Sequence, residues 1–160
     1  MSRYAENTSV PADRSRAEIE RTLQRYGADQ FMYGWEQGRA IIAFRMNGRY
    51  VRLMLPMPDR DDPEFWQTPS GRRRRDDSAA EREWEKATRQ RWRALALVVK
   101  AKLEAVEAGI SSFEREFLAA LVLPDGSTVS DLMEPQIEKA YATNAMPRGL
   151  TLQLTAGDPK

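Results

Sequence analysis

Four consecutive arginines, Arg72 to Arg75, follow a Pro-Ser-Gly turn and precede Asp76 and Asp77. Guanidinium groups bind phosphate oxygens, and each neutralised phosphate releases counterions, so this loop could bind nucleic acid in a salt-dependent way. The alternative is a solvated loop at a helix start, where the aspartates are favourable near the positive end of the helix dipole. The arginines oppose that dipole, so Arg72, Arg73, Arg74 and Arg75 remain candidate phosphate ligands.

A second basic group surrounds a tight turn signal, Asn47-Gly48. A two-residue turn there would place Arg45 opposite Tyr50 on one face of a sheet, with Arg52 on the same face and Arg49 beside the turn. Single-strand binders often stack bases on an aromatic side chain of such a basic face. One tyrosine is fewer than usual. Another segment could instead cover this face, because it also carries apolar side chains: Met32, Ile41 and Met54.

Much catalytic chemistry is excluded because the chain has no cysteine and no histidine. Disulfides, thiolate nucleophiles, Cys/His zinc sites and Ser-His-Asp triads are impossible. An acidic run interrupted by Arg60 lacks an EF-hand pattern, so we predict no metal site. The Pro58-Asp59 pair begins a nuclease-like pattern, but Trp84 stands where a second acid is needed. We therefore predict no enzyme and no cofactor. The acidic run consists of Asp59, Asp61, Asp62 and Glu64.

The bulk properties predict a soluble protein of the cytoplasm. The net charge is only +1, so attraction to nucleic acid must come from local clusters. No apolar run approaches the length that crosses a bilayer, and the polar N-terminus lacks the apolar core of a secretory signal. We accordingly expect no membrane partner.

The elements that would position the basic groups begin with a helix from Ser15, its predicted cap, to a stop at Gly27. Alternating apolar residues and two turn signals then predict an antiparallel meander over 30–36, 39–46 and 49–55. The Asn47-Gly48 register gives four pairs: Met46 with Arg49, Phe44 with Val51, Ile42 with Leu53 and Ala40 with Leu55. With Phe31, Tyr33 and Trp35 these form the face expected to be buried beneath the first helix.

Helices dominate the second half. Ser78 is the predicted cap of a helix to about 108, roughly 45 Å long and apolar along one side. A short helix from Ser111 or Ser112 and a Pro-Asp-Gly turn follow. Ser130 is the expected cap of a last helix over about 131–142. The side chains predicted to face inward there are Leu132, Met133, Ile137 and Tyr141.

These elements predict an α+β fold: an N-terminal helix on a three-stranded antiparallel meander, then a long helix and a C-terminal helical region. Residues 1–14 are expected to form a flexible arm and 143–160 a flexible tail. A single domain spans 15–142. It contains helix and sheet (15–55), a connector with the arginine loop (56–77, the loop itself being 68–77) and a helical part (78–142).

Three stretches stand out: "SRAEIERTLQRYGA", the sheet ending in "LPMPD", and "RQRWRALALVVKAKLEAVEAGISSFEREFLAALVLPDGSTV". Through them most of the chain resembles a family of small proteins encoded by tailed phages and prophages. The more specific parts are "RWRALALVVKAKLEAVEAGI" and the "LPDG" turn, and the similarity runs from about 15 to 141. The family has no assigned activity. The resemblance therefore implies a phage context and a bacterial host cytoplasm, and it supplies no catalytic residue.

Two functions follow from these patterns. The first is a non-enzymatic nucleic-acid-binding accessory protein whose arginine loop contacts phosphates, with single strands favoured over duplex. The second is a protein-interaction module, or a homodimer, that assembles through the apolar stripe of the 78–108 helix.

Overall fold

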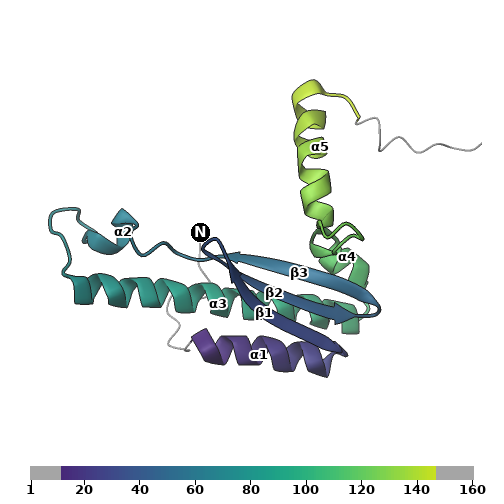
Figure 1. Cartoon of the computed structure of the whole chain (residues 1–160), viewed down its shortest axis with the longest axis horizontal. Helices are drawn as coiled ribbons and strands as arrows, with labels where there is room; N and C mark the ends of the chain where they lie inside the picture. The colour runs from purple at the N-terminus through teal and green to yellow at the C-terminus, as the bar shows by residue number, and fades with distance from the viewer. Residues whose placement is uncertain (1–11, 147–160) are drawn as a thin grey trace, which may run out of the picture.

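The computed structural model describes residues 12–146 and confirms the α+β fold (Figure 1). Within these residues no helix is both long enough and apolar enough to span a membrane. The predicted arm and tail lie largely outside the described residues. The elements are α1 (Ala12–Arg25), β1 (Gln30–Glu36), β2 (Arg39–Met46), β3 (Arg49–Pro56), α2 (Pro63–Trp66), α3 (Asp77–Glu107), α4 (Phe113–Phe117), the 3-10 helix η1 (Leu118–Ala120) and α5 (Val129–Thr143).

The three strands form an antiparallel sheet in the order β1-β2-β3. The predicted register is confirmed, with Phe44 opposite Val51 and Arg45 opposite Tyr50. Both hairpin turns place two successive residues at positive φ, as at Asn47 (52°) and Gly48 (71°). Such turns match the twist of the strands, which is why short Asn-Gly and Gln-Gly sequences can set the pairing.

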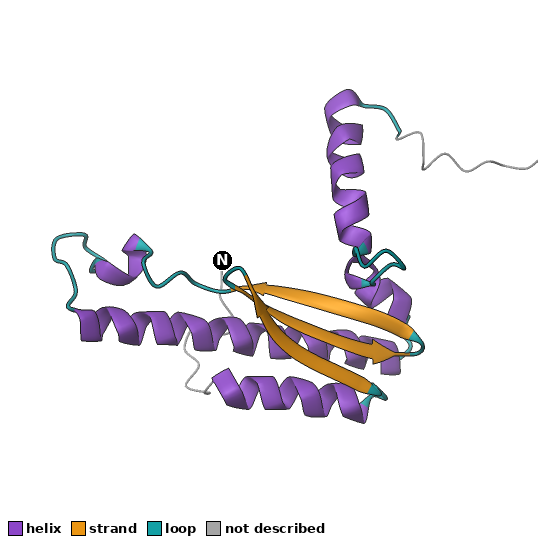
Figure 2. Ribbon diagram, viewed as in Figure 1, coloured by secondary structure: helices purple, strands orange, loops and turns teal. Residues whose placement is uncertain are grey.

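One face of the sheet packs on α1 and α3, which lie side by side beneath it (Figures 1 and 2). Phe44 meets Phe117 of α4 edge-to-face, with 5.6 Å between the ring centroids. We expected the first helix to cover this face of the sheet. In the structure two helices cover it, because α3 packs there beside α1. Trp35 departs from the prediction, because it is 58% exposed at the end of its strand. The fully buried side chains include Ile19, Leu23, Ile42, Phe44, Val51, Trp92, Val99, Leu103 and Phe117.

The N-terminal half of α3 is covered by the connector and α2. Phe65 and Ala80 are buried there, and Trp84 Nε1 donates a hydrogen bond of 2.9 Å to the carbonyl of Pro58. The apolar stripe predicted for self-association is thus largely used within the chain. Among the described residues of α3, Val98 is the exposed large apolar side chain, at 49%.

Three predicted helix caps are wrong by a few residues. Asp76 caps α3 by accepting from the amide of Ala79, two residues before the predicted Ser78. Thr128 caps α5 in a capping box with Asp131, two residues before Ser130. Ser15 lies inside α1, which includes residues 12–14 of the predicted arm. Asp and Thr side chains accept amide hydrogens as serine does, so the nearest serine is not a reliable marker of a helix start.

The C-terminal helix α5 stands away from the sheet (Figure 1). We predicted that four of its apolar side chains face inward, and this is wrong for three of them, whereas Met133 is half-buried. Leu132, Ile137 and Tyr141 are 52%, 45% and 85% exposed, and none of the described α5 residues is buried. Because α1 and α3 already cover the inner sheet face, α5 is attached mainly through η1 and its own first turn.

Candidate nucleic-acid interface

The arginine loop folds back on α2 as a small closed structure. Gln67 and Arg74 form an isolated antiparallel bridge, and the amide of Thr68 donates to the carbonyl of Arg73 at 3.0 Å. Gly71 turns the chain with a φ of 67°, a conformation that favours glycine. The loop backbone is therefore held by its own hydrogen bonds, with the arginine side chains projecting from it.

Arg75 has a structural role. Its Nη1 donates to the carbonyls of Glu64 and Phe65 at 3.0 and 3.2 Å, and its amide donates to the carbonyl of Trp66 at 2.7 Å. These carbonyls belong to the short helix α2, whose last turn has few partners of its own. Arg75 thus ties the loop to α2 and is less available to a ligand than its three neighbours.

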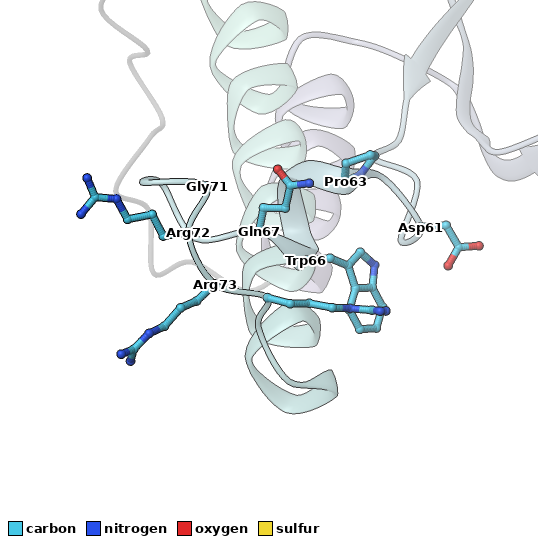
Figure 3. A pocket seen from close by; sticks show the side chains of 8 residues that line it. Asp61, Pro63, Trp66, Gln67, Gly71, Arg72 and Arg73 are labelled. Carbon is cyan, nitrogen blue, oxygen red and sulfur yellow. The ribbon is translucent and has the colours of Figure 1, made fainter.

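Arg74 is paired with an aromatic ring. Its guanidinium carbon lies 5.0 Å from the ring centroid of Trp66, within the range of a cation–π contact. Trp66 Nε1 donates to the carbonyl of Arg60 at 3.0 Å, which sets the orientation of the indole. The pair lines an open hollow of about 540 Å³ (Figure 3). The hollow is also lined by Asp61, Pro63, Gln67, Gly71, Arg72 and Arg73.

Arg72 and Arg73 project into solvent (Figure 3). No ion pair of either residue occurs within residues 12–146. The carboxylate of Asp76 is used as the cap of α3, and Asp61 points away on the opposite side of the hollow. The neighbouring acids therefore leave these two guanidinium groups unpaired.

The acidic run beside the hollow is arranged as a turn. The Asp59 carboxylate accepts from the amide of Asp61 at 3.0 Å, and Arg60 forms an ion pair with Glu81. Between residues 12 and 146 the carboxylates nowhere gather in a group of three that could hold a metal ion.

Arg45, on the outer sheet face, is held by an acid that the sequence did not single out. Its Nε donates to both carboxylate oxygens of Asp29, at 2.9 and 3.1 Å. The hydrogen bonds from Arg45 lower the pKa of Asp29 below its usual value. The guanidinium also lies 5.9 Å from the ring centroid of Tyr50. Arg45 is therefore already neutralised by a partner.

Arg52 is paired as well, although more loosely. Its Nη2 lies 3.5 Å from Oδ2 of Asp131, which also accepts from the amide of Thr128 in the cap of α5. The cap hydrogen bonds, and secondarily Arg52, lower the pKa of Asp131. Arg49 is exposed beside the turn, and Tyr50 is 50% exposed. Of the predicted sheet-face residues, these two remain accessible.

The alternative was that another segment covers the outer sheet face. The long helix α3 packs on the opposite face and leaves this one largely open. Met32 and Met54 are 60% and 39% exposed. The two basic groups do not meet, however. The arginine loop lies by the start of α3, and the β2–β3 turn lies toward its other end (Figure 1). Since α3 is about 45 Å long, they form separate surfaces.

Trp66 is the residue whose role in this site the sequence did not predict. Of the adjacent aromatic residues Phe65 and Trp66, only Phe65 is buried, and Trp66 is half-buried. The signal in the sequence was a tryptophan placed between an acidic run and an arginine run within one short connector. Searches of protein-family models, of curated proteins and of solved structures found no match to this chain. The similarity to phage-encoded proteins therefore stays a prediction.

Proposed function

We propose that this protein is a small, non-enzymatic nucleic-acid-binding accessory protein that contacts phosphates through its arginine loop. The supporting observation is that Arg72 and Arg73 are exposed and form no ion pair with residues 12–146, beside an Arg74–Trp66 pair on the same loop. The resemblance to phage-encoded proteins supports a role in phage or prophage DNA metabolism in a bacterial cytoplasm.

A single strand suits the loop better than a duplex. Trp66 offers a π surface beside three guanidinium groups, and this combination is typical of proteins that bind single strands by stacking and backbone charge. In a duplex the base faces are already stacked on one another. The sheet face, whose Arg45 and Arg52 are paired with acids, is at most a secondary contact.

The test is a titration of a fluorescently labelled short oligo(dT) and its duplex at about 50 and 200 mM salt. The wild-type protein should bind the single strand more tightly, with affinity falling as salt rises. Each lost phosphate contact reduces the slope of log K against log salt by about 0.7 for single strands. Arg72→Ala/Arg73→Ala should therefore reduce that slope by about 1.4.

A charge-matched control comes from two exposed arginines outside the loop, Arg91 and Arg115. Arg91→Ala/Arg115→Ala removes the same charge and should leave the salt slope near the wild-type value. Equal effects of the two double variants would show that binding depends on the overall positive charge and not on the arginine loop. Absence of binding at the lower salt concentration would remove the proposed function.

A second candidate function is protein interaction through α5 rather than through α3. Its exposed Leu132, Ile137 and Tyr141 are large apolar side chains of the kind that helix-mediated contacts bury. Light scattering of the wild type and of Leu132→Ser/Ile137→Ser separates the possibilities. A wild-type dimer that becomes a monomer in the variant supports assembly through α5, and a monomer in both removes self-association there.

A further inference from the structure

A second cavity, of about 600 Å³, lies where α1, β1, the connector and α3 meet. Three of the four tryptophans line it, together with Tyr33. Trp92 is 1% exposed and Trp35 is 58% exposed, so one indole lies in the interior and another at the solvent side. The Tyr33 ring lies between them, 5.6 Å from Trp92 and 6.0 Å from Trp35 by ring centroids. Four aromatic rings therefore form part of the wall, beside polar and charged residues that include Arg16, Asp59 and Arg60.

Three buried polar atoms on this wall have no hydrogen-bond partner among residues 12–146: Tyr33 Oη, Thr88 Oγ1 and Arg16 Nε. The Arg16 guanidinium lies over the Tyr33 ring at 4.7 Å and is paired through Nη2 with the exposed Asp13. Burying such groups without partners is unfavourable, and in native proteins each such group calls for an explanation such as a functional role or a bound water or ion.

The aromatic rings and the unpaired polar atoms together indicate which kind of ligand this cavity could bind. Aromatic walls favour a planar ring, while the two hydroxyls and the Arg16 N–H require polar atoms on the edge of that ring. A purely apolar ligand would leave all three polar atoms unpaired, and a bare phosphate would lose its hydration against indole. A nucleobase has a π face and a rim of carbonyl and ring-nitrogen atoms. The volume of the cavity lies within the range of small-molecule sites and leaves room for the sugar attached to the base.

We propose that this cavity binds one unstacked nucleobase. The connector joins it to the arginine loop, since Asp59 and Arg60 line the cavity and Asp61 lines the hollow beside Trp66. The base could belong to a bound strand or to a free nucleotide. Only the first of these sources rests on the proposed function. The chemistry recognised is the same in both cases.

The experiment uses tryptophan fluorescence in a Trp66→Phe background. The remaining tryptophans, Trp35, Trp84 and Trp92, all line the cavity, so their emission reports on it alone. The probes are oligo(dT) of about eight nucleotides, an abasic oligomer of the same length and free dTMP. Oligo(dT) should quench the emission. The abasic strand should bind the protein that retains Trp66, through its phosphates, and fluorescence anisotropy measures this binding. In the Trp66→Phe reporter variant the abasic strand should not quench the tryptophan emission.

Tyr33→Phe/Thr88→Val tests the cavity directly. Both substitutions remove hydroxyls that have no partner in the described chain, so the fold should be retained. The affinity seen by quenching should fall about twofold to tenfold for each lost hydrogen bond. The matched control is Tyr141→Phe/Thr143→Val on α5, which is exposed and distant from the cavity, and it should leave quenching unchanged.

The outcomes separate the two proposals. Quenching by dTMP but not by oligo(dT) supports the cavity and assigns it to a free nucleotide. Unchanged emission with both, or equal quenching in Tyr33→Phe/Thr88→Val and the wild type, overturns it. Failure of the abasic strand to bind at low salt contradicts the arginine-loop function and leaves the cavity result standing.

Discussion

The guanidinium of Arg74 lies over the indole ring of Trp66, 5.0 Å from the ring centroid. The two residues come from opposite sides of the arginine loop, and the bridge between Gln67 and Arg74 brings them together. A cation held against a ring in this way presents charge and a π surface to the same ligand. The arginine run therefore contains three kinds of residue: Arg72 and Arg73 have no ion pair within residues 12–146, Arg74 is stacked on Trp66, and Arg75 binds carbonyls of α2.

Removal of the ring should weaken single-strand binding. We expect Trp66→Ala to lower the affinity for oligo(dT) by about 1–3 kcal/mol, the usual contribution of one aromatic stacking partner. Trp66→Phe keeps a ring and should lose less. Anisotropy titration at fixed salt measures the effect, and circular dichroism checks the fold. Wild-type affinity in Trp66→Ala would show that the ring only supports Arg74.

Arg75 should matter to stability more than to binding. Arg75→Ala deletes two charge-assisted hydrogen bonds to carbonyls of α2 and should lower the free energy of unfolding by about 1–3 kcal/mol. Its neighbour Arg73 is exposed, so Arg73→Ala should change stability by less than about 0.5 kcal/mol. Urea denaturation compares the two. Similar unfolding midpoints in both variants would contradict the structural role of Arg75.

The cap of α3 offers a second stability test. Asp76→Ala removes the hydrogen bond to the amide of Ala79 and should cost about 1 kcal/mol. Ser78→Ala removes the residue that the sequence pattern favoured as the cap. Ser78 Oγ accepts a hydrogen bond from the exposed Arg82 side chain, so its loss should cost less than about 0.5 kcal/mol. Thermal unfolding ranks the two variants, and a larger loss in Ser78→Ala would reverse the assignment.

The Asp29–Arg45 pair predicts part of the acid sensitivity. The pKa of Asp29 is lower in the folded protein than its ordinary value of 3.8, because the carboxylate accepts hydrogen bonds from Arg45. A lowered folded pKa contributes stability above the unfolded value, and this contribution disappears as pH falls through the folded pKa. Asp29→Asn should therefore reduce stability at neutral pH and flatten its decline below about pH 4.

Melting temperatures of the wild type, Asp29→Asn, Arg45→Gln and the double variant, measured across this pH range, provide the check. The two substitutions remove the same interaction, so the double variant should be little worse than either single variant at neutral pH. Additive losses would mean that the pair does not act as a unit.

The sheet and its register were predictable from the sequence because the information is local. Asn47-Gly48 and Gln37-Gly38 supply adjacent residues at positive φ, and alternating apolar side chains leave one register that buries Phe44 with Val51. The residues at which the helices begin were harder to predict from the sequence. Apolar periodicity marks the buried face of a helix, whereas Asp76 and Thr128 mark where hydrogen bonding begins.

The amino-acid sequence by itself determined the α+β class, the strand pairing and which segments carry the basic side chains. Only the tertiary structure decided which of those charges are free. Arg45 is paired with Asp29, Arg52 with Asp131, and Arg75 with carbonyls of α2, whereas Arg72 and Arg73 keep no such partner in the described chain. The fold also exposed α5 and assembled the aromatic cavity from four segments. The physical reason is range: turn and strand preferences act between neighbours, while charge pairing and cavity lining depend on residues that folding brings together.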